Sequence, residues 1–259
     1  MIPVISMIQK TKSDLVVKNL HAGTHDHPIL HGVNLALRPG QIIALMGPNA
    51  SGKSTLANVL MGHPEYQVTD GTIFWKGKNI LKLKTHQRAR MGLFSSFQNP
   101  VEVPGVNLYE FLDTAYSIDK KSSNTRKEFE QRIKQAQQNL KLSSDFLDRG
   151  LNVGFSGGEK KRSETLQLQV LQPLLAILDE IDSGLDIDAL KLVAEGVKKM
   201  SSAGTGFLII THYQRLLNYL EPDEVHVMID GRIVMSGGPE LVKKLEREGY
   251  KWLQATVPL

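Results

Sequence analysis

The sequence predicts an α/β protein with a mostly parallel sheet, an antiparallel β subdomain and a helical insertion. Two apolar runs of strand length, 42–46 and 174–178, end at polar residues: the first leads into a glycine-rich loop, the second into Asp179 and Glu180. Continuous apolar runs are typical of parallel strands that are covered on both faces. From 106 to about 170, strand-like runs stop and helical spacing takes over, which indicates the insertion.

The glycine-rich loop matches the pattern G-x-x-x-x-G-K-[ST] and lies between a strand-like run and a helix-compatible run. That context is typical of a phosphate-binding loop rather than a chance Gly/Ser turn. Backbone N–H groups of such a loop turn toward phosphate oxygens, and the helix start adds its positive dipole end. We expect Lys53 to reach the β- and γ-phosphates and Ser54 to ligand Mg²⁺. The expected nucleotide-binding residues of this loop are Gly47, Pro48, Asn49, Ala50, Ser51, Gly52, Lys53, Ser54 and Thr55.

Length and composition exclude several classes of protein. The chain has 259 residues, 41% hydrophobic and 22% charged, which is typical of a globular protein with one large domain. No apolar run approaches the roughly 20 residues that a membrane span needs, and the N-terminus lacks the features of a signal peptide. We therefore expect a soluble, cytoplasmic protein. The net charge of +4 is spread along the chain, which disfavours nucleic-acid binding, and there is no cysteine for disulfide or thiolate chemistry.

The first predicted strands are 14–20 and 29–37, joined by a histidine-rich turn. These histidines could indicate a metal site, but they lack a carboxylate cluster, so surface histidines of a hairpin are the preferred interpretation. The other expected elements are a hairpin at 71–80, a helix at 85–91, a strand at 93–97, helices at 106–117, 127–142 and 157–171, a strand at 174–180, a helix at 188–200, a strand at 206–211, a hairpin at 225–235 and a helix at 239–248.

Polar residues at the ends of predicted strands extend the candidate site, because ligands bind beyond the carboxyl ends of parallel strands. Asp179 can hold Mg²⁺ through its water shell, and Glu180 can accept a proton from the attacking water; a capping acid pair is the alternative. Gln98 can orient water or touch Mg²⁺, although a glutamine at such a place is more often a surface residue. For His212, at the end of the strand 206–211, a phosphate contact is favoured.

A second candidate phosphate contact precedes the helix 157–171. Ser156 is a potential N-cap, Gly157 and Gly158 open the helix, and Glu159 lies early in its first turn. The hydroxyl and backbone N–H groups could meet phosphate oxygens there. A plain Ser-Gly-Gly cap remains the alternative.

The order of these motifs resembles that of the ATP-binding cassette (ABC) ATPases over nearly the whole chain. The resemblance implies a Mg²⁺-dependent ATPase made of one domain, 1–259, with core segments 14–100 and 171–259 and a helical subdomain at 101–170. It implies that two cassettes face each other head to tail when ATP binds. The segment 156–159 would then serve the nucleotide of the partner copy. The resemblance further implies that Lys53, Glu180 and His212 carry catalysis, and that Ser54, Gln98 and Asp179 surround Mg²⁺.

Longer segments resemble one branch of that family, the ATPases of SUF iron–sulfur cluster assembly. The segments that carry this resemblance are NPVEVPGV, NVGFSGGEKKR, LDEIDSGLDIDALK, ITHYQRLLNYLEPDEVHVMIDGRIVMSGG and GYKWL. This resemblance implies the scaffold partners SufB and SufD, which ATP-driven self-dimerisation would reshape. Because thiolates hold most clusters, a chain without cysteine would leave the cluster to its partners. The ATPase subunit of a membrane transporter is the alternative.

Two positions depart from the family pattern. Many cassettes carry an aromatic residue that stacks on adenine after the first strand, where this chain has Thr24 with His25 and His27 nearby. Ala50 stands where glycine is common in the phosphate loop. Because alanine suits a negative φ angle, we expect the loop to be retained, with an altered affinity for the nucleotide.

Overall fold

The computed structural model describes residues 14–118, 125–211 and 214–254. Its strands are β1 (Leu15–Gly23), β2 (Pro28–Leu37), β3 (Ile42–Met46), β4 (Gln67–Trp75), β5 (Lys78–Asn79), β6 (Leu93–Ser95), β7 (Val103–Asn107), β8 (Gly150–Leu151), β9 (Leu175–Asp179), β10 (Gly206–Ile210), β11 (Glu224–Ile229) and β12 (Arg232–Gly237). Its helices are α2 (Lys53–Met61), α3 (Thr85–Arg90), α4 (Leu108–Ser117), α5 (Thr125–Asn139), the 3-10 helix η1 (Ser144–Leu147), α6 (Gly157–Leu171), α7 (Ile187–Ser202), α8 (Gln214–Leu220), α9 (Glu240–Glu248) and α10 (Lys251–Gln254).

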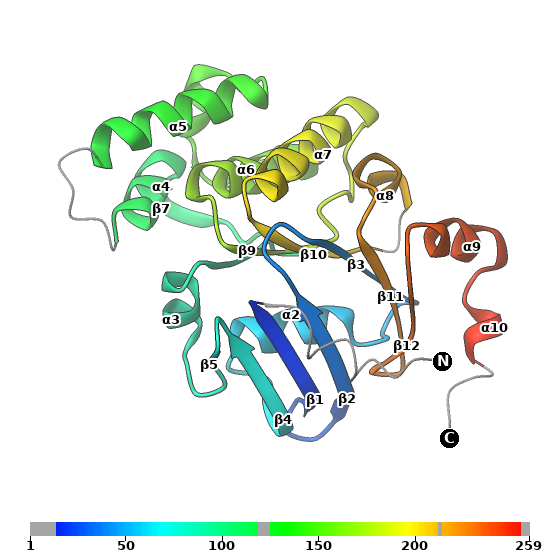
Figure 1. The fold of residues 1–259 in the computed structure, drawn as a ribbon. Helices are drawn as coiled ribbons and strands as arrows, with labels where there is room; N and C mark the ends of the chain where they lie inside the picture. Colours follow the sequence, from blue (N-terminus) through cyan, green and yellow to red (C-terminus); the bar gives the residue numbers. More distant parts are fainter. Residues whose placement is uncertain (1–13, 119–124, 212–213, 255–259) are drawn as a thin grey trace.

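A six-stranded, mostly parallel sheet forms the centre of the molecule, in the order β12-β11-β3-β10-β9-β6 (Figure 1). Only β12 among these strands runs antiparallel to its neighbour. Every residue of β3, β9 and β10 is buried, because helices or a second sheet cover both faces. Because β3, β6, β9 and β10 run parallel to one another, their carboxyl ends lie at the same edge of the sheet.

Alternate residues of each central strand enter different cores. Ile42, Ala44 and Met46 of β3 pack in a cluster with apolar residues of α7, α8 and α9. Ile43 and Leu45 face the opposite way and pack with α2 and with the antiparallel sheet β2-β1-β4-β5. Helices α7, α8 and α9 thus lie on one side of the central sheet, and α2 lies with the second sheet on the other side (Figure 1).

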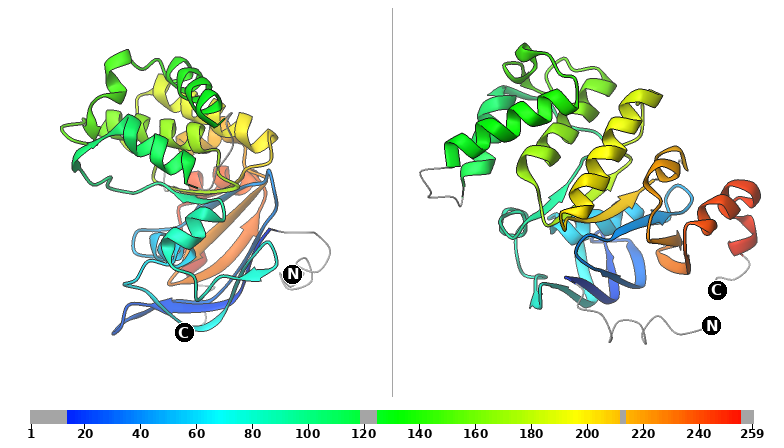
Figure 2. Two further views of the ribbon diagram at one scale, coloured as in Figure 1. Left: turned by 90° about the vertical axis from the view of Figure 1, so that its left-hand side faces the viewer. Right: turned by 45° about the horizontal axis from the view of Figure 1, so that its top comes forward.

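Helices α4, α5 and α6 form a subdomain at one end of the molecule, as both views in Figure 2 show. Its core is a separate apolar cluster that includes Leu112 of α4, Phe129 of α5 and Leu166 of α6. Phe129 is fully buried and its ring contacts those of Tyr109 and Tyr116. The helical spacing in α4 and α5 reflects burial on one face of each helix, whereas α6 is buried on more than one face: Leu166 joins this cluster and Leu168 joins the cluster that contains α7.

The predicted fold class is confirmed, with differences in the short elements. The expectation that strands cease after residue 106 is wrong at β8, which pairs with the mostly exposed β7. Neither strand shows hydrophobic alternation, so the sequence carried no signal for them. Helices α8 and α10 were not predicted either, because they are too short to display a period; burial of Leu216 and Leu253 anchors them. In the described ranges, no helix is long and apolar enough to cross a bilayer.

Candidate nucleotide-binding site

The phosphate loop connects β3 to α2 in a backbone conformation that needs glycine at two places. Gly52, which precedes α2, has a φ of 103°. A Cβ on Gly47 would lie 2.1 Å from the carbonyl oxygen of Met228 on the neighbouring strand β11. Because neither position accepts a side chain, the two glycines of the sequence pattern are explained by the local backbone.

Ala50 corrects one expectation. Its φ is +61°, in the left-handed region, and not negative as its identity suggested. A residue with a Cβ costs roughly 1–2 kcal/mol there. The loop keeps its shape because both neighbouring segments are fixed: Gly231 donates its N–H to the Ser51 carbonyl at 2.9 Å, and α2 begins immediately afterwards. The loop is therefore retained with strain stored at Ala50.

Lys53 is folded back into the loop. Its ammonium donates to the carbonyl oxygens of Gly47 at 3.0 Å and Pro48 at 2.8 Å, and the side chain is buried. Burial lowers the pKa of Lys53, while the charges of Asp179 and Glu180 oppose that shift. Both carboxylates therefore lie close enough to the phosphate loop to influence the charge of Lys53.

Asp179 ends β9 and is buried beside the start of α2. Burial raises the pKa of its carboxyl, and the Ser54 hydroxyl and the Lys53 charge lower it. Its N–H donates to the Ser96 hydroxyl at 2.9 Å, whereas its Oδ1 has no hydrogen-bond partner among the described residues. A buried carboxylate oxygen next to a serine hydroxyl is a donor set that suits a hard divalent cation such as Mg²⁺. The residues present therefore fit that ion.

Glu180 and Gln98 are hydrogen-bonded to each other. The side-chain amide of Gln98 donates to Oε2 of Glu180 at 2.9 Å, which joins the ends of β6 and β9. Glu180 has a φ of +51° and donates its N–H to the Ile210 carbonyl of β10. A left-handed glutamate directly after a buried strand is a strained residue of the kind found at functional sites. The structure thus places Gln98 at the candidate site, although a glutamine at the end of a strand is more often a surface residue.

Ser156 caps helix α6, as the sequence indicated. Its hydroxyl accepts from the N–H of Glu159 at 3.2 Å, and the Glu159 carboxylate accepts from the N–H of Ser156 at 2.8 Å. The second carboxylate oxygen of Glu159 accepts from Arg149, which sequence reasoning missed. Arg149 and Ser156 together lower the pKa of Glu159 to about 2, so that this carboxyl is ionised.

A buried ion pair of helix α6 also escaped sequence reasoning. Lys161 and Glu164 lie 3.2 Å apart with side chains only 6% and 3% exposed. Glu164 accepts from the N–H of Phe97 at 2.6 Å, and Lys161 donates to the carbonyls of Phe97 and Gln98 at 3.0 and 3.4 Å. The pair therefore holds the backbone of Phe97 and Gln98 against helix α6. The only signal in the sequence is the i, i+3 spacing of opposite charges.

Other predicted residues are placed less completely. His212 lies outside the described residues. Thr24, His25 and His27 are exposed in the β1–β2 turn, and His25 contacts Asp26. Groups of three or more histidine and acidic residues suited to a metal ion are absent from the described parts of the chain.

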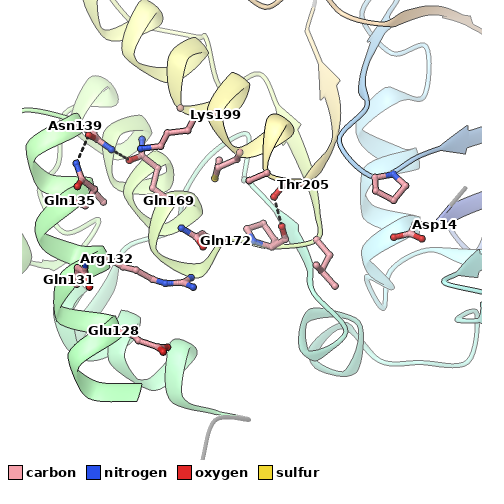
Figure 3. Close-up of a pocket in the computed structure, with 18 of the residues that line it drawn as sticks. Asp14, Glu128, Gln131, Arg132, Gln135, Asn139, Gln169, Gln172, Lys199 and Thr205 are labelled. Atoms are coloured by element: carbon pink, nitrogen blue, oxygen red, sulfur yellow. Dashed lines mark hydrogen bonds between the residues drawn. The ribbon is translucent and has the colours of Figure 1, made fainter. Parts of the chain in front are cut away.

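A cavity of about 710 Å³ lies between α5, the end of α6 and the end of α7 (Figure 3). Its lining includes Arg132, Gln169 and Lys199, and the close-up shows Asn139 bonded to Gln169 across it. Residues of the phosphate loop, Gln98, Asp179 and Glu180 are not among its lining residues in the described chain. This cavity is therefore separate from the candidate site.

Comparison with known proteins places the chain in a family. The family described as "ABC transporter" matches residues 30–183. "Probable ATP-dependent transporter slr0075" of Synechocystis is 50% identical over 247 residues, 94% of this chain and 96% of that protein. "Probable ATP-dependent transporter SufC" of Escherichia coli K12 is 50% identical over 243 residues, 92% of this chain and 98% of that protein. The solved "Structure of ATP binding subunit of ABC transporter" aligns with a TM-score of 0.78, at 24% identity, over 93% of this chain and 98% of that chain.

The family match covers more than half of the chain and includes the phosphate loop, Gln98 and Asp179. The relatives match over almost their whole length, so the similarity is not confined to the nucleotide site. The solved structure supports the fold independently. The chain therefore belongs to the ATP-binding cassette family of ATP-hydrolysing proteins, and E. coli SufC is among the members that it resembles.

Proposed function

We propose that this chain is the ATP-hydrolysing subunit of a SUF-type iron–sulfur cluster assembly complex. The observation that carries the proposal is the 50% identity to E. coli SufC across 98% of that protein. ATP would bring two copies of the chain together, and their movement would reshape a scaffold of SufB- and SufD-like proteins. The chain has no cysteine, so it supplies motion while its partners supply the thiolates that hold a cluster.

Phosphate binding falls to Lys53 and the loop N–H groups. On ATP binding, the Lys53 ammonium exchanges the carbonyls of Gly47 and Pro48 for the β- and γ-phosphate oxygens. Ser54, Gln98 and Asp179 would hold Mg²⁺, which supplies charge neutralisation on the phosphates when bound. Asp179 is suited to this because its buried Oδ1 lacks a protein partner among the described residues.

Hydrolysis falls to Glu180. Its carboxylate takes a proton from the attacking water as the γ-phosphoryl group passes to that water and ADP leaves. The hydrogen bond from Gln98 holds this carboxylate at 2.9 Å, so Gln98 orients the base as well as the metal site. We assign His212 to the γ-phosphate by the family resemblance alone.

The start of helix α6 would complete the site of a second copy. Ser156 and Gly157 are exposed, and the Gly157 and Gly158 N–H groups open the helix, so the positive dipole end is accessible to phosphate oxygens. Glu159 has both carboxylate oxygens engaged by Ser156 and Arg149. We therefore propose that Glu159 shapes the helix start rather than touching the nucleotide itself.

The test combines one variant with one pull-down. Glu180→Gln should bind ATP with unchanged affinity and accumulate as an ATP-dependent dimer in sedimentation velocity, while phosphate release falls at least a hundredfold. Normal turnover in this variant would remove Glu180 from its role. Wild-type chain purified from its own host should carry SufB- and SufD-like proteins and hydrolyse ATP faster with them than alone.

A transporter ATPase is the second candidate, because the similar proteins of Synechocystis and E. coli are named as ATP-dependent transporters. It predicts the same behaviour of Glu180→Gln but a different partner. Co-purification with a membrane-spanning protein in detergent, without SufB- or SufD-like proteins, would favour the transporter. Cluster transfer by the purified complex would favour the assembly role.

A further inference from the structure

The first turn of helix α6 contains an acidic residue, Glu159. A negative charge at this place is unfavourable if the helix start faces a phosphate group. The dipole of a helix start attracts anions, but Glu159 adds a full negative charge to the first turn. Its pKa of about 2 keeps it ionised at neutral pH. Left alone, this charge would oppose the approach of a triphosphate.

Arg149 is placed to cancel that charge. Its guanidinium bonds Oε1 of Glu159 and lies 4.2 Å over the ring of Phe155. Its carbonyl accepts from the N–H of Leu108, which ties it to the start of α4. Both side chains of the ion pair are largely covered, with 34% and 25% of their surfaces exposed. The nearby Lys160 is paired elsewhere, with Glu102 at 3.5 Å.

We propose that Arg149 is a charge-neutralising and positioning residue of the Ser-Gly-Gly segment (156–158). By cancelling the charge of Glu159 and holding its carboxylate inward, Arg149 lets the nucleotide of a second copy approach the start of α6. The inference rests on the proposed function, since only a two-copy arrangement brings a triphosphate to this helix. It assigns Arg149 a part in ATP-dependent dimerisation and none in binding ATP to the chain's own phosphate loop.

Two consequences separate this role from a purely structural one. Loss of Arg149 should harm dimerisation through the charge left on Glu159, so neutralising Glu159 as well should restore it. The loss of dimerisation should also become smaller as salt screens the repulsion between Glu159 and the triphosphate, because charges near the surface interact less at high ionic strength. A residue that merely held the fold together would show neither effect.

The experiment uses the Glu180→Gln parent, in which ATP is turned over slowly, and measures the ATP-dependent dimer by sedimentation velocity at 50 and 500 mM salt. R149Q should weaken the dimer about tenfold or more at low salt, with a smaller deficit at high salt. R149Q/E159Q and R149K should dimerise within about threefold of the parent. R126Q is the matched control: Arg126 also pairs with acids, Asp113 among them, and lies over aromatic rings, yet in the described chain it makes no hydrogen bond or ion pair with the Ser-Gly-Gly segment or with Glu159.

Binding of a fluorescent ATP analogue to the monomer and the melting temperature report on each variant's phosphate loop and fold. If R149Q dimerises like the parent, or if adding E159Q brings no recovery, the inference is overturned while the proposed function stands. If the parent itself fails to dimerise with ATP, both are overturned. Should R149Q not fold, R149K and R149Q/E159Q carry the test, and failure of both folded variants to dimerise overturns the inference.

Discussion

Replacing Ala50 with glycine should stabilise this protein, the opposite of what that exchange does at most alanines. Ala50 is exposed and has a φ of +61°, so its methyl group adds strain and fills no cavity. Relief of the left-handed conformation is worth roughly 1–2 kcal/mol. Against this, glycine adds about 0.4–1 kcal/mol of conformational entropy to the unfolded chain. The balance favours A50G by about 0.5–1 kcal/mol.

The expected shift is measurable by thermal unfolding. For a chain of this size, 1 kcal/mol moves the melting temperature by about 2–4 °C, so A50G should melt about 1–4 °C higher. A115G is the matched control, because Ala115 is half-buried inside helix α4. There the same exchange should cost about 1 kcal/mol and lower the melting temperature by about 2–4 °C. Both variants are melted without nucleotide, since a bound ligand would shift the transition by mass action.

The essential result is that the melting temperature rises in A50G and falls in A115G. If A50G melts lower, by an amount similar to A115G, then Ala50 has a negative φ in solution and the account of the loop is wrong. ATP affinity gives a second check. Because glycine adopts the same backbone without strain, the loop of A50G should bind ATP within about threefold of wild type.

The remaining predictions concern buried or paired charges. D179N should lose turnover yet melt at a higher temperature, because burial raises the pKa of Asp179 and an amide escapes the cost of ionisation; a lower melting temperature would contradict this. The pKa of Glu159 is lowered from 4.5 to about 2, so its stabilising effect is complete above pH 4.5 and is lost as pH falls toward 2. Acid titration of R149Q should accordingly show a shallower loss of stability over that window, and an unchanged slope would refute the pairing with Arg149. K161M should cost about 3 kcal/mol in urea unfolding, because it leaves the charge of Glu164 buried without its partner. K161M/E164Q should recover at least half of that loss, and a double variant as unstable as K161M would show that the charge is not the cause.

The fold class and the main members of the candidate site could be inferred from sequence because their signals are local. A continuous apolar run marks a strand covered on both faces, and parallel strands end at one edge of the sheet. Asp179 ends β9 and Lys53 follows the loop after β3, so those two patterns were sufficient to predict that they meet. In the structure, the charge of Asp179 opposes the lowering of the Lys53 pKa, and the charge of Lys53 lowers the pKa of Asp179.

Other features depend on contacts between distant segments, and only the tertiary structure decided them. Glu164 binds the backbone of Phe97, 67 residues away, and no spacing rule connects them. The positive φ of Ala50 follows from how the loop is clamped between β3, α2 and the turn at Gly231, whereas the residue type alone suggested the reverse. Sequence patterns record which residues are buried along one element. The pairing of charges and the strain of a loop arise only when separate elements are packed against each other, and the packing sets their geometry.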